Sequence, residues 1–256
     1  MKTFCFTVDD NIRCLKELTE GTYGSIFEHP YLAMYKRLHE TFDLQVQLNL
    51  FYRMEGFDLS MMSDRFYKEW EENARWLKLS FHSDYENVKP YEFSGYEEVY
   101  THCQQVNKQI LRFASAKALA ETTTIHYCLA TEEGLRAMVD NRVTGLLGLY
   151  GTDAEPRVSY GIAGEPAAQL RRGAVVQKDG IAHAAIDIVL NAFSTEQILV
   201  KLADLQSHEM IRVMIHEQYF YPDYPAYQPE FEEKLAATFG YLTQQGYKSV
   251  FFEQML

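Results

Sequence analysis

The sequence lacks any excess of basic residues. Its 256 residues include 24 Lys and Arg against 36 Asp and Glu, which gives a formal net charge of −12. Nucleic acids and anionic membrane surfaces attract clustered positive charge, so neither is expected as a partner. No apolar run approaches the roughly 18 residues that a spanning helix needs. The first residues show no basic n-region and no long apolar h-region, so we expect no secretory leader. We expect a soluble, cytoplasmic protein, whose oligomeric state the sequence does not set.

Cysteine residues are also few, and glycine-rich loops are lacking. The four cysteines form no CxxC pair and show no metal-finger spacing, and Cys5 and Cys128 lie within strand-like runs as small core residues. No predicted strand is followed by a glycine-rich phosphate loop, and residues 161–164 lack the spacing of the dinucleotide fingerprint. The cysteine spacing and the lack of glycine-rich loops thus argue against a disulfide scaffold, a zinc finger and a nucleotide-binding fold.

Strand-like and helix-like stretches alternate along the whole chain. Apolar residues make up 47% of the sequence, enough for a large core in one domain spanning residues 1–256. About seven strand–helix repeats predict a mostly parallel sheet with helices outside, either open or closed into a barrel. An irregular segment at about 151–190 includes a predicted β-hairpin that turns at residues 178–180. Residues 44–50 alternate apolar and polar side chains, which predicts a half-buried strand.

The first predicted strand, residues 3–10, ends on two carboxylates. Alternation along a strand sends Asp9 and Asp10 to different sides, so that one can hold a metal while the other does another task. The alternative is that the acids and Asn11 cap the next helix, with Asn11 as the capping residue.

Polar side chains also end three later strands. His82 follows residues 76–81, His126 lies in a predicted strand at 122–128, and His216 follows residues 210–215. In a barrel these ends converge on one mouth, which favours the barrel over the open sheet. An Asp10, His82 and His126 set suits Zn²⁺ or another first-row divalent ion. Each histidine alone has a structural alternative, as a loop cap or a hydrogen-bonded core residue.

Other residues near these strand ends are candidates for further tasks. Asp9 is the candidate general base and His216 the candidate acid. The candidates for substrate binding are Asp187, Glu217 and Tyr219, the last in an aromatic loop that can stack on a sugar or simply pack. Asp84 and Glu86 are reserve metal ligands.

Two of these motifs resemble the polysaccharide deacetylases, carbohydrate esterase family 4 and its relatives. Residues 6–10, Phe-Thr-Val-Asp-Asp, resemble the family's Thr-Phe-Asp-Asp motif, and residues 81–83, Phe-His-Ser, resemble its His-Ser/Thr-x-x-His motif. The resemblance implies an irregular (β/α)₇ barrel of the glycoside hydrolase/deacetylase type, in which Asp9 is the base, Asp10 and His82 bind the metal, and His216 is the acid. The family's second histidine falls on Glu86, so the third ligand is Glu86 or His126, and we favour His126. Asn11 replaces the usual glycine, and the family's arginine motif is not evident.

The sequence therefore predicts a metal-dependent hydrolase that removes an N-acetyl group from a sugar or polysaccharide precursor. We expect a divalent metal, with zinc as the first choice, and a small-molecule or glycan substrate. Two rivals stay open: a catalytically inactive carbohydrate-binding relative, and a barrel metallohydrolase that cleaves a small-molecule amide.

Overall fold

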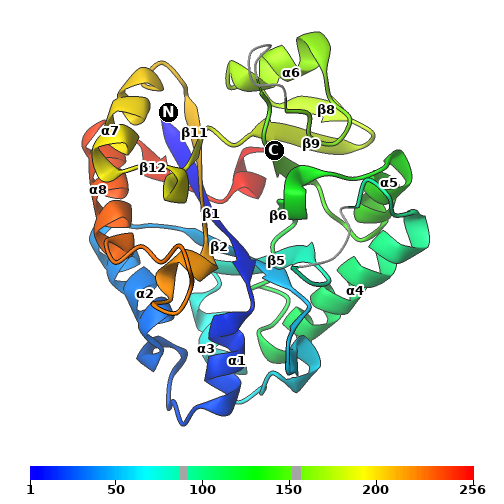
Figure 1. Ribbon diagram of the computed structural model, residues 1–256, viewed down its shortest axis with the longest axis vertical. Helices are drawn as coiled ribbons and strands as arrows, with labels where there is room; N and C mark the ends of the chain where they lie inside the picture. The colour runs from blue at the N-terminus through cyan, green and yellow to red at the C-terminus, as the bar shows by residue number, and fades with distance from the viewer. Residues whose placement is uncertain (87–90, 152–156) are drawn as a thin grey trace.

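A parallel sheet forms the centre of the computed structural model, which describes residues 1–86, 91–151 and 157–256. Its strand order is β10-β11-β1-β2-β5, and β12 pairs with the start of β1. The bounds are β1 Thr3–Asn11, β2 Val46–Phe51, β5 Leu77–Ser83, β10 Ile188–Val189, β11 Met210–His216 and β12 Lys248–Ser249. The first strand thus lies in the middle of the sheet, between an early and a late neighbour (Figure 1).

A second sheet continues the first, in the order β6-β7-β9-β8. Its strands are β6 Thr122–Thr123, β7 Gly145–Gly148, β8 Val176–Lys178 and β9 Ile181–Ala185, and a separate small hairpin pairs β3 Arg53–Met54 with β4 Phe57–Asp58. The predicted hairpin is confirmed: β8 and β9 are antiparallel, and the turn residues Asp179 and Gly180 both have positive φ angles. Its second arm also pairs with β7 and so belongs to the main architecture. Residues 152–156 of the predicted irregular segment lie outside the described residues.

Short hydrogen-bonded links join the two sheets at one end. Leu79 of β5 donates its N–H to the carbonyl of Ala118 and accepts from the N–H of Ala120, at 2.8 and 2.9 Å. These residues lie just before β6, so the link continues the sheet from β5 towards β6.

At the other end, the sheets are joined by a strand that changes its pairing partner. The N–H of Ile186 donates to Gly148 of β7, and the N–H of the next residue, Asp187, donates to Arg212 of β11. The segment β9–β10 is therefore one bent strand that leaves β7 and joins β11. The strands follow one another as β1, β2, β5, β6, β7, β9–β10 and β11, and the predicted irregular (β/α)₇ barrel is confirmed.

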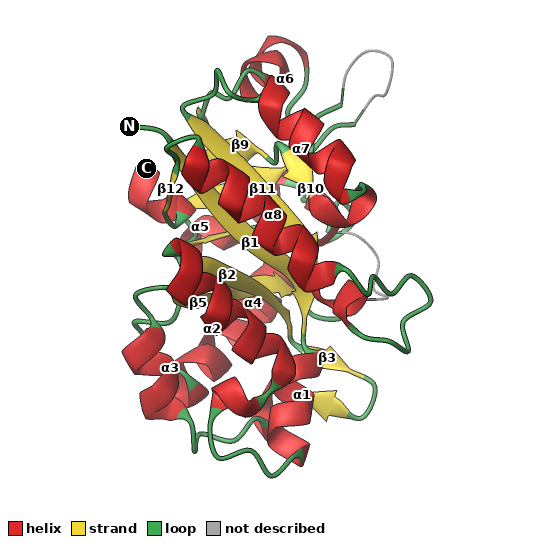
Figure 2. Cartoon of the chain, turned by 90° about the vertical axis from the view of Figure 1, so that its left-hand side faces the viewer, coloured by secondary structure: helices red, strands yellow, loops and turns green. Residues whose placement is uncertain are grey.

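Helices cover the outside of this barrel. They are α1 Arg13–Glu20, α2 Pro30–Phe42, α3 Tyr67–Asn73, α4 Tyr96–Phe113, α5 Glu132–Asp140, α6 Gly164–Arg171, α7 Thr195–Asp204 and α8 Phe231–Gln244. Figure 2 shows α2, α7 and α8 across one face of β1, β2 and β11. Phe239 of α8 contacts Phe4 and Phe6 of β1, with ring centroids 5.6 and 4.9 Å apart. Within the described ranges, no helix is both long and apolar enough to cross a membrane.

The inside of the barrel is polar beside β2, and this corrects one prediction. Strand β2 is buried along its whole length, although its alternation predicted a half-buried strand. Gln47 donates to the side-chain oxygen of Asn49 and to the carbonyl of Thr122, both at 2.8 Å, and Ser80 also donates to Asn49. The polar half of the alternating pattern therefore faces a hydrogen-bonded interior and not solvent.

The strand predicted at residues 122–128 is also shorter than expected. Only Thr122 and Thr123 pair as β6, whereas residues His126–Cys128 form a single 3₁₀ turn. Tyr127 and Cys128 in that turn have φ angles of 63° and 57°. His126 is therefore presented by a tight turn above the end of the barrel.

Candidate metal centre

A kink at the end of β1 brings two carboxylates to one place. Asp10 has a φ of 64°, and the register between β1 and β2 shifts between Val8 and Asn11. Strand alternation alone would send Asp9 and Asp10 to opposite sides. The left-handed residue breaks that alternation, so both side chains line the same pocket at the mouth of the barrel.

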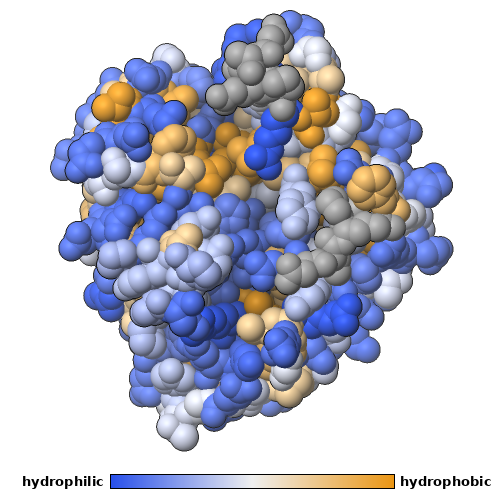
Figure 3. All heavy atoms as spheres, in the orientation of Figure 1, coloured by the Kyte–Doolittle hydropathy of each residue, from blue (hydrophilic) through white to orange (hydrophobic). Residues whose placement is uncertain are grey.

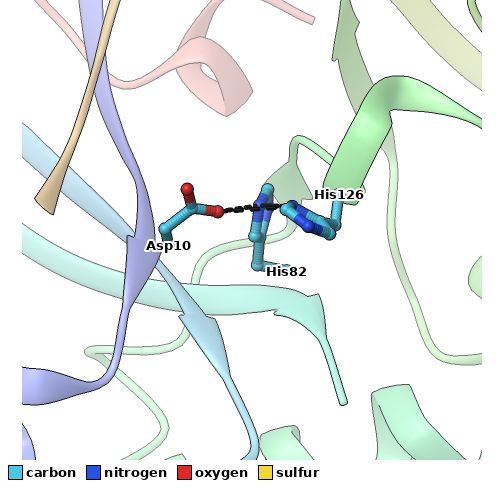
Figure 4. Close-up of side chains that lie close together, drawn as sticks. All are labelled: Asp10, His82 and His126. Atoms are coloured by element: carbon cyan, nitrogen blue, oxygen red, sulfur yellow. Dashed lines mark hydrogen bonds and ion pairs between the residues drawn. The ribbon is translucent and has the colours of Figure 1, made fainter. Parts of the chain in front are cut away.

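Asp10, His82 and His126 converge above the barrel from three elements (Figure 4). Oδ1 of Asp10 lies 3.0 Å from Nε2 of His82 and 3.3 Å from Nδ1 of His126, and the two nitrogens are 3.1 Å apart. An ion with bonds of about 2.0–2.1 Å spaces its neighbouring ligand atoms by about 2.9–3.4 Å. The three atoms already have that spacing.

Main-chain carbonyls determine which histidine nitrogens face the centre. Nδ1 of His82 hydrogen-bonds to the carbonyl of Thr124, and Nε2 of His126 lies 3.1 Å from the carbonyl of Glu86. A carbonyl only accepts, so each of these nitrogens carries a proton. The other nitrogen of each ring, in its neutral form, points a lone pair at Asp10. Two lone pairs and a carboxylate oxygen that face one another are a donor set for a cation, with the outer hydrogen bonds that metal-binding histidines usually make.

The charges around the centre favour a positive species. Burial opposes ionisation of Asp10, but hydrogen bonds from His126 and His82 outweigh it and hold the pKa of Asp10 well below its usual range. Burial likewise opposes protonation of His82, but the negative charges of Asp9 and Asp10 outweigh it and raise the pKa of His82. A proton and a metal ion therefore compete for the same lone pairs. The amide of Gln218 donates to Oδ2 of Asp10 at 2.8 Å and holds the carboxylate in this orientation.

Asp9 lies beside this centre without joining it. Its side chain is 2% exposed, and Oδ1 accepts a hydrogen bond of 2.6 Å from Nδ2 of Asn49. Burial raises the pKa of Asp9, although the nearby histidines His82 and His216 act in the opposite direction. A buried carboxylate with a raised pKa is a stronger proton acceptor than an exposed one.

His216 ends β11 next to Asp9. The two residues are partners in the parallel register of β1 and β11, and both line the pocket. Nδ1 of His216 lies 2.8 Å from the side-chain oxygen of Asn191. That oxygen accepts the Nδ1 proton, so Nε2 is the nitrogen left to exchange a proton with a ligand.

The pocket above the centre has a volume of about 720 Å³. Its lining includes the polar groups described above and also aliphatic side chains, among them Leu149, Ile186, Val189 and Met214. Figure 3 shows hydrophobic surface gathered above the middle of this face, between α7 and β9, next to a hydrophilic centre. A pocket of this kind positions an amphipathic ligand over the ligand set.

The two reserve ligands do not join the centre. The carboxylate of Asp84 accepts two hydrogen bonds from Arg53, at 2.7 and 3.0 Å, because the strand turns away after Ser83. Glu86 lines the pocket, but it contacts His126 through its main-chain carbonyl. Among the described residues the three-ligand set consists of Asp10, His82 and His126.

Glu217 was predicted to bind substrate, and the structure corrects this placement. Its side chain is 1% exposed, and its carboxylate accepts the main-chain N–H groups of Ile12, Arg13 and Cys14 at 2.7 to 3.0 Å. These are the free N–H groups at the start of α1, where a negative charge is stabilising. Glu217 therefore caps α1, which also replaces the predicted cap, Asn11. The side chain of Asn11 instead donates to the carbonyls of Val8 and Asn49.

The other two substrate-binding candidates line the pocket in different ways. Asp187 lies at its floor, where its carboxylate accepts from the N–H of Arg212 at 2.8 Å and pairs with the guanidinium at 3.3 Å. This carboxylate is thus already paired with a buried cation. Tyr219 lies at the side, 6.2 Å from the ring of His216. Substrate contacts by both residues stay predictions.

Sequence reasoning missed the residues that orient the site. Asn49, Asn191 and Gln218 each hydrogen-bond one of the predicted chemical groups. Asn49 is a polar member of an alternating strand, a pattern that predicts exposure to solvent and so gives no signal for a residue that orients the site. Asn191 and Gln218 lie in single 3₁₀ turns, Leu190–Ala192 and Glu217–Phe220, which are too short to carry a periodic signal.

Comparison with solved structures confirms the predicted resemblance at the level of the fold. The chain is similar to a family 4 acetyl xylan esterase from Clostridium thermocellum, solved with a cobalt ion, at 10% identity and a TM-score of 0.54, covering 99% of this chain and 90% of that one. It is also similar to the Bc1960 peptidoglycan N-acetylglucosamine deacetylase, at 11% identity and a TM-score of 0.51, covering 99% and 87%. No family model matches the chain, and no curated protein matches it in sequence.

A third similar structure is a 4-alpha-glucanotransferase from Thermococcus litoralis. The TM-score is 0.60 at 11% identity, and the match covers 99% of this chain but only 40% of that one. One fold thus occurs in proteins named for different reactions, and the reaction of this chain has to be argued from its own side chains.

Proposed function

From a fold shared with family 4 deacetylases and a three-ligand centre at the mouth of its barrel, we propose that this protein is a metal-dependent hydrolase. Its substrate is the N-acetyl group of a sugar or a polysaccharide precursor. The observation that carries the proposal is the convergence of one carboxylate oxygen and two histidine lone pairs at 3.0 to 3.3 Å.

The donor set fits zinc or another first-row divalent ion, held by Asp10, His82 and His126. Such an ion, when bound, lowers the pKa of a water molecule and polarises the carbonyl of the scissile amide. Gln218 and the two main-chain carbonyls keep the three ligands in place.

Asp9 and His216 supply the proton transfers in this proposal. Asp9 takes a proton from the attacking water, whose oxygen forms a bond to the acyl carbon. His216 gives a proton to the amide nitrogen as the carbon–nitrogen bond breaks, and the products are a carboxylate and an amine. The two residues lie side by side on β1 and β11 and line one pocket, so the base and the acid reach one substrate group.

A second candidate substrate is a small-molecule amide. The pocket volume of about 720 Å³ lies within the range of small-ligand sites, and the aliphatic side chains of its lining fit an apolar substituent. The same centre and the same proton transfers serve both candidates.

The test is metal content followed by acetate release. We expect about one zinc, cobalt or similar ion per chain, and its loss in His82→Ala and His126→Ala. Asp84→Asn is the matched control, because Asp84 lies two residues from His82 but pairs with Arg53. The zinc-loaded protein should release acetate from N-acetylglucosamine oligomers. A chain that takes up no ion refutes the hydrolase; a metal-loaded chain that binds the oligomers without turnover is an inactive relative.

A further inference from the structure

We infer that Tyr127 is the substrate platform of this site, a ring on which a sugar stacks next to the metal ligands. The inference rests on the proposed function and deepens it, because an aromatic platform selects a cyclic sugar over an open-chain amide. It assigns a substrate contact to a residue in the turn that carries the third ligand.

The position of Tyr127 fits that task. It follows the ligand His126 directly, with the two ring centroids 4.0 Å apart, and it lines the pocket. Its side chain is nevertheless 47% exposed, and no described residue hydrogen-bonds to its hydroxyl. The two rings are tilted by 45° to each other, so Tyr127 leans on the metal ligand and keeps a large exposed surface that a ligand can cover.

The backbone at Tyr127 is strained. Its φ and ψ are 63° and −2°, and the next residue, Cys128, has a φ of 57°. Bulky side chains rarely adopt this left-handed conformation, which Gly, Asn and Asp adopt more readily. Two such residues in succession turn the chain so that Cys128 is buried and Tyr127 points outward. Strain of this kind persists mainly where the side chain has a use.

Tyr160 also has a left-handed backbone, and there the contacts of the side chain explain the strained conformation. Tyr160 has a φ of 53° but is 1% exposed, and its hydroxyl donates to Leu147 and accepts the N–H of Ile125. Its strain is offset by burial and by hydrogen bonds. The turn that presents His126 requires this backbone at position 127, but neither burial nor a hydrogen bond within the described residues explains why the side chain there is a tyrosine. A ligand contact does explain it.

The chemistry of the platform matches a sugar. An aromatic ring offers an apolar face, which suits the C–H face of a pyranose, and a polar tip, which suits its hydroxyls. Tyr219 lines the same pocket beside His216, so one ring flanks the ligand set and another flanks the candidate acid. Both tyrosines line the pocket that Asp9 and Asp10 also line, so a sugar bound against either ring lies in the same pocket as the two carboxylates.

The experiment measures binding to the zinc-loaded protein by calorimetry. The probes are the β-1,4-linked tetramer of N-acetylglucosamine, which has rings, and acetohydroxamate, which binds a metal and has none. We expect Tyr127→Gly to raise the Kd for the tetramer about 3–10-fold, Tyr127→Phe to leave it near wild type, and acetohydroxamate to bind all three equally. Because glycine tolerates the left-handed backbone, Tyr127→Gly should also raise Tm by about 2–4 °C.

Arg142→Gly is the matched control. Arg142 has a φ of 66° and is exposed after α5, outside the pocket. The Arg142→Gly variant should raise Tm in the same way and leave the Kd values for the tetramer and for acetohydroxamate unchanged. A tetramer that binds Tyr127→Gly as tightly as wild type, or that does not bind the wild type, overturns the inference. Tyr127-dependent binding without acetate release supports the platform and refutes only the deacetylase proposal.

Discussion

Asp9 and His216 are register partners on neighbouring parallel strands, so that the candidate base and the candidate acid stand side by side at the same mouth. Residues paired in this way point to the same face of the sheet, about 5 Å apart along the hydrogen-bonding direction. The arrangement separates proton transfer, on β1 and β11, from ion binding, for which β1, β5 and the 126–128 turn supply the ligands.

Replacing Asp9 by asparagine should therefore remove activity and leave the ion in place. We expect Asp9→Asn to lower kcat about 10²–10⁴-fold, because the amide cannot take a proton from water. Metal analysis of the same preparation is the control, and it should still find about one ion per chain. Full activity in Asp9→Asn would remove Asp9 from the mechanism.

Asn191 should act through His216. Asn191→Ala removes the acceptor of the Nδ1 proton, and we expect kcat to fall about 10-fold with little change in KM. Asn191→Asp places a carboxylate on the same nitrogen and stabilises the imidazolium. The alkaline limb of its kcat/KM profile should therefore move to higher pH. An unchanged pH profile in Asn191→Asp would show that His216 is not the acid.

Glu217 should contribute to stability and not to substrate binding. Glu217→Gln keeps the shape but replaces one of the two accepting oxygens with an NH₂ donor that faces the main-chain N–H groups of α1, and we expect the free energy of unfolding to fall by about 1–3 kcal/mol, measured in urea. Glu196→Gln, at the exposed first turn of α7, is the matched control and should change it by less than about 0.5 kcal/mol. A large rise in KM for Glu217→Gln at unchanged stability would return Glu217 to the substrate site.

His183 should make folding stability depend on pH. Burial, and then the charge of Lys178, lowers its pKa from 6.5 to about 4. Below pH 6.5 the unfolded chain takes up a proton that the folded chain refuses, so stability falls as the pH drops towards 4 and then levels off. The full difference is about 3 kcal/mol.

The measurement is urea unfolding at pH 7.5 and pH 4.5. His183→Phe keeps a ring beside Tyr160, 5.5 Å away in the native protein, and cannot be protonated. We expect the variant to lose about 2 kcal/mol less than wild type between the two pH values. Equal losses in the two proteins would show that His183 does not titrate on unfolding.

The strand ends were predictable because the sequence changes abruptly from apolar to polar residues there. Asp10, His82 and His126 were grouped on that signal, and the structure brings them together. The grouping depended on a barrel, since only converging strands join residues so far apart in sequence.

The other features of the site depend on contacts between residues that are distant in the sequence, and no local sequence pattern predicts such contacts. The cap of α1 comes from Glu217, about 200 positions later, and the turn that presents His126 has two left-handed residues where a strand was expected. The alternation of β2 correctly predicts a strand, but periodicity does not distinguish a polar barrel interior from solvent. The partners Asn191 and Gln218 lie in short 3₁₀ turns, where only tertiary structure decides which side chains are in contact.

The central position of β1 has a consequence for synthesis of the protein. The strand that carries Asp9 and Asp10 pairs on one side with β2 and on the other with β11, which begins at Met210. At about 5–20 residues per second, a ribosome needs on the order of ten seconds or more to make the intervening chain. Through that interval β1 has an open, apolar edge, the kind that joins strands of other chains. Premature termination before β11 therefore yields a fragment prone to aggregation, although all three metal ligands are already present in it.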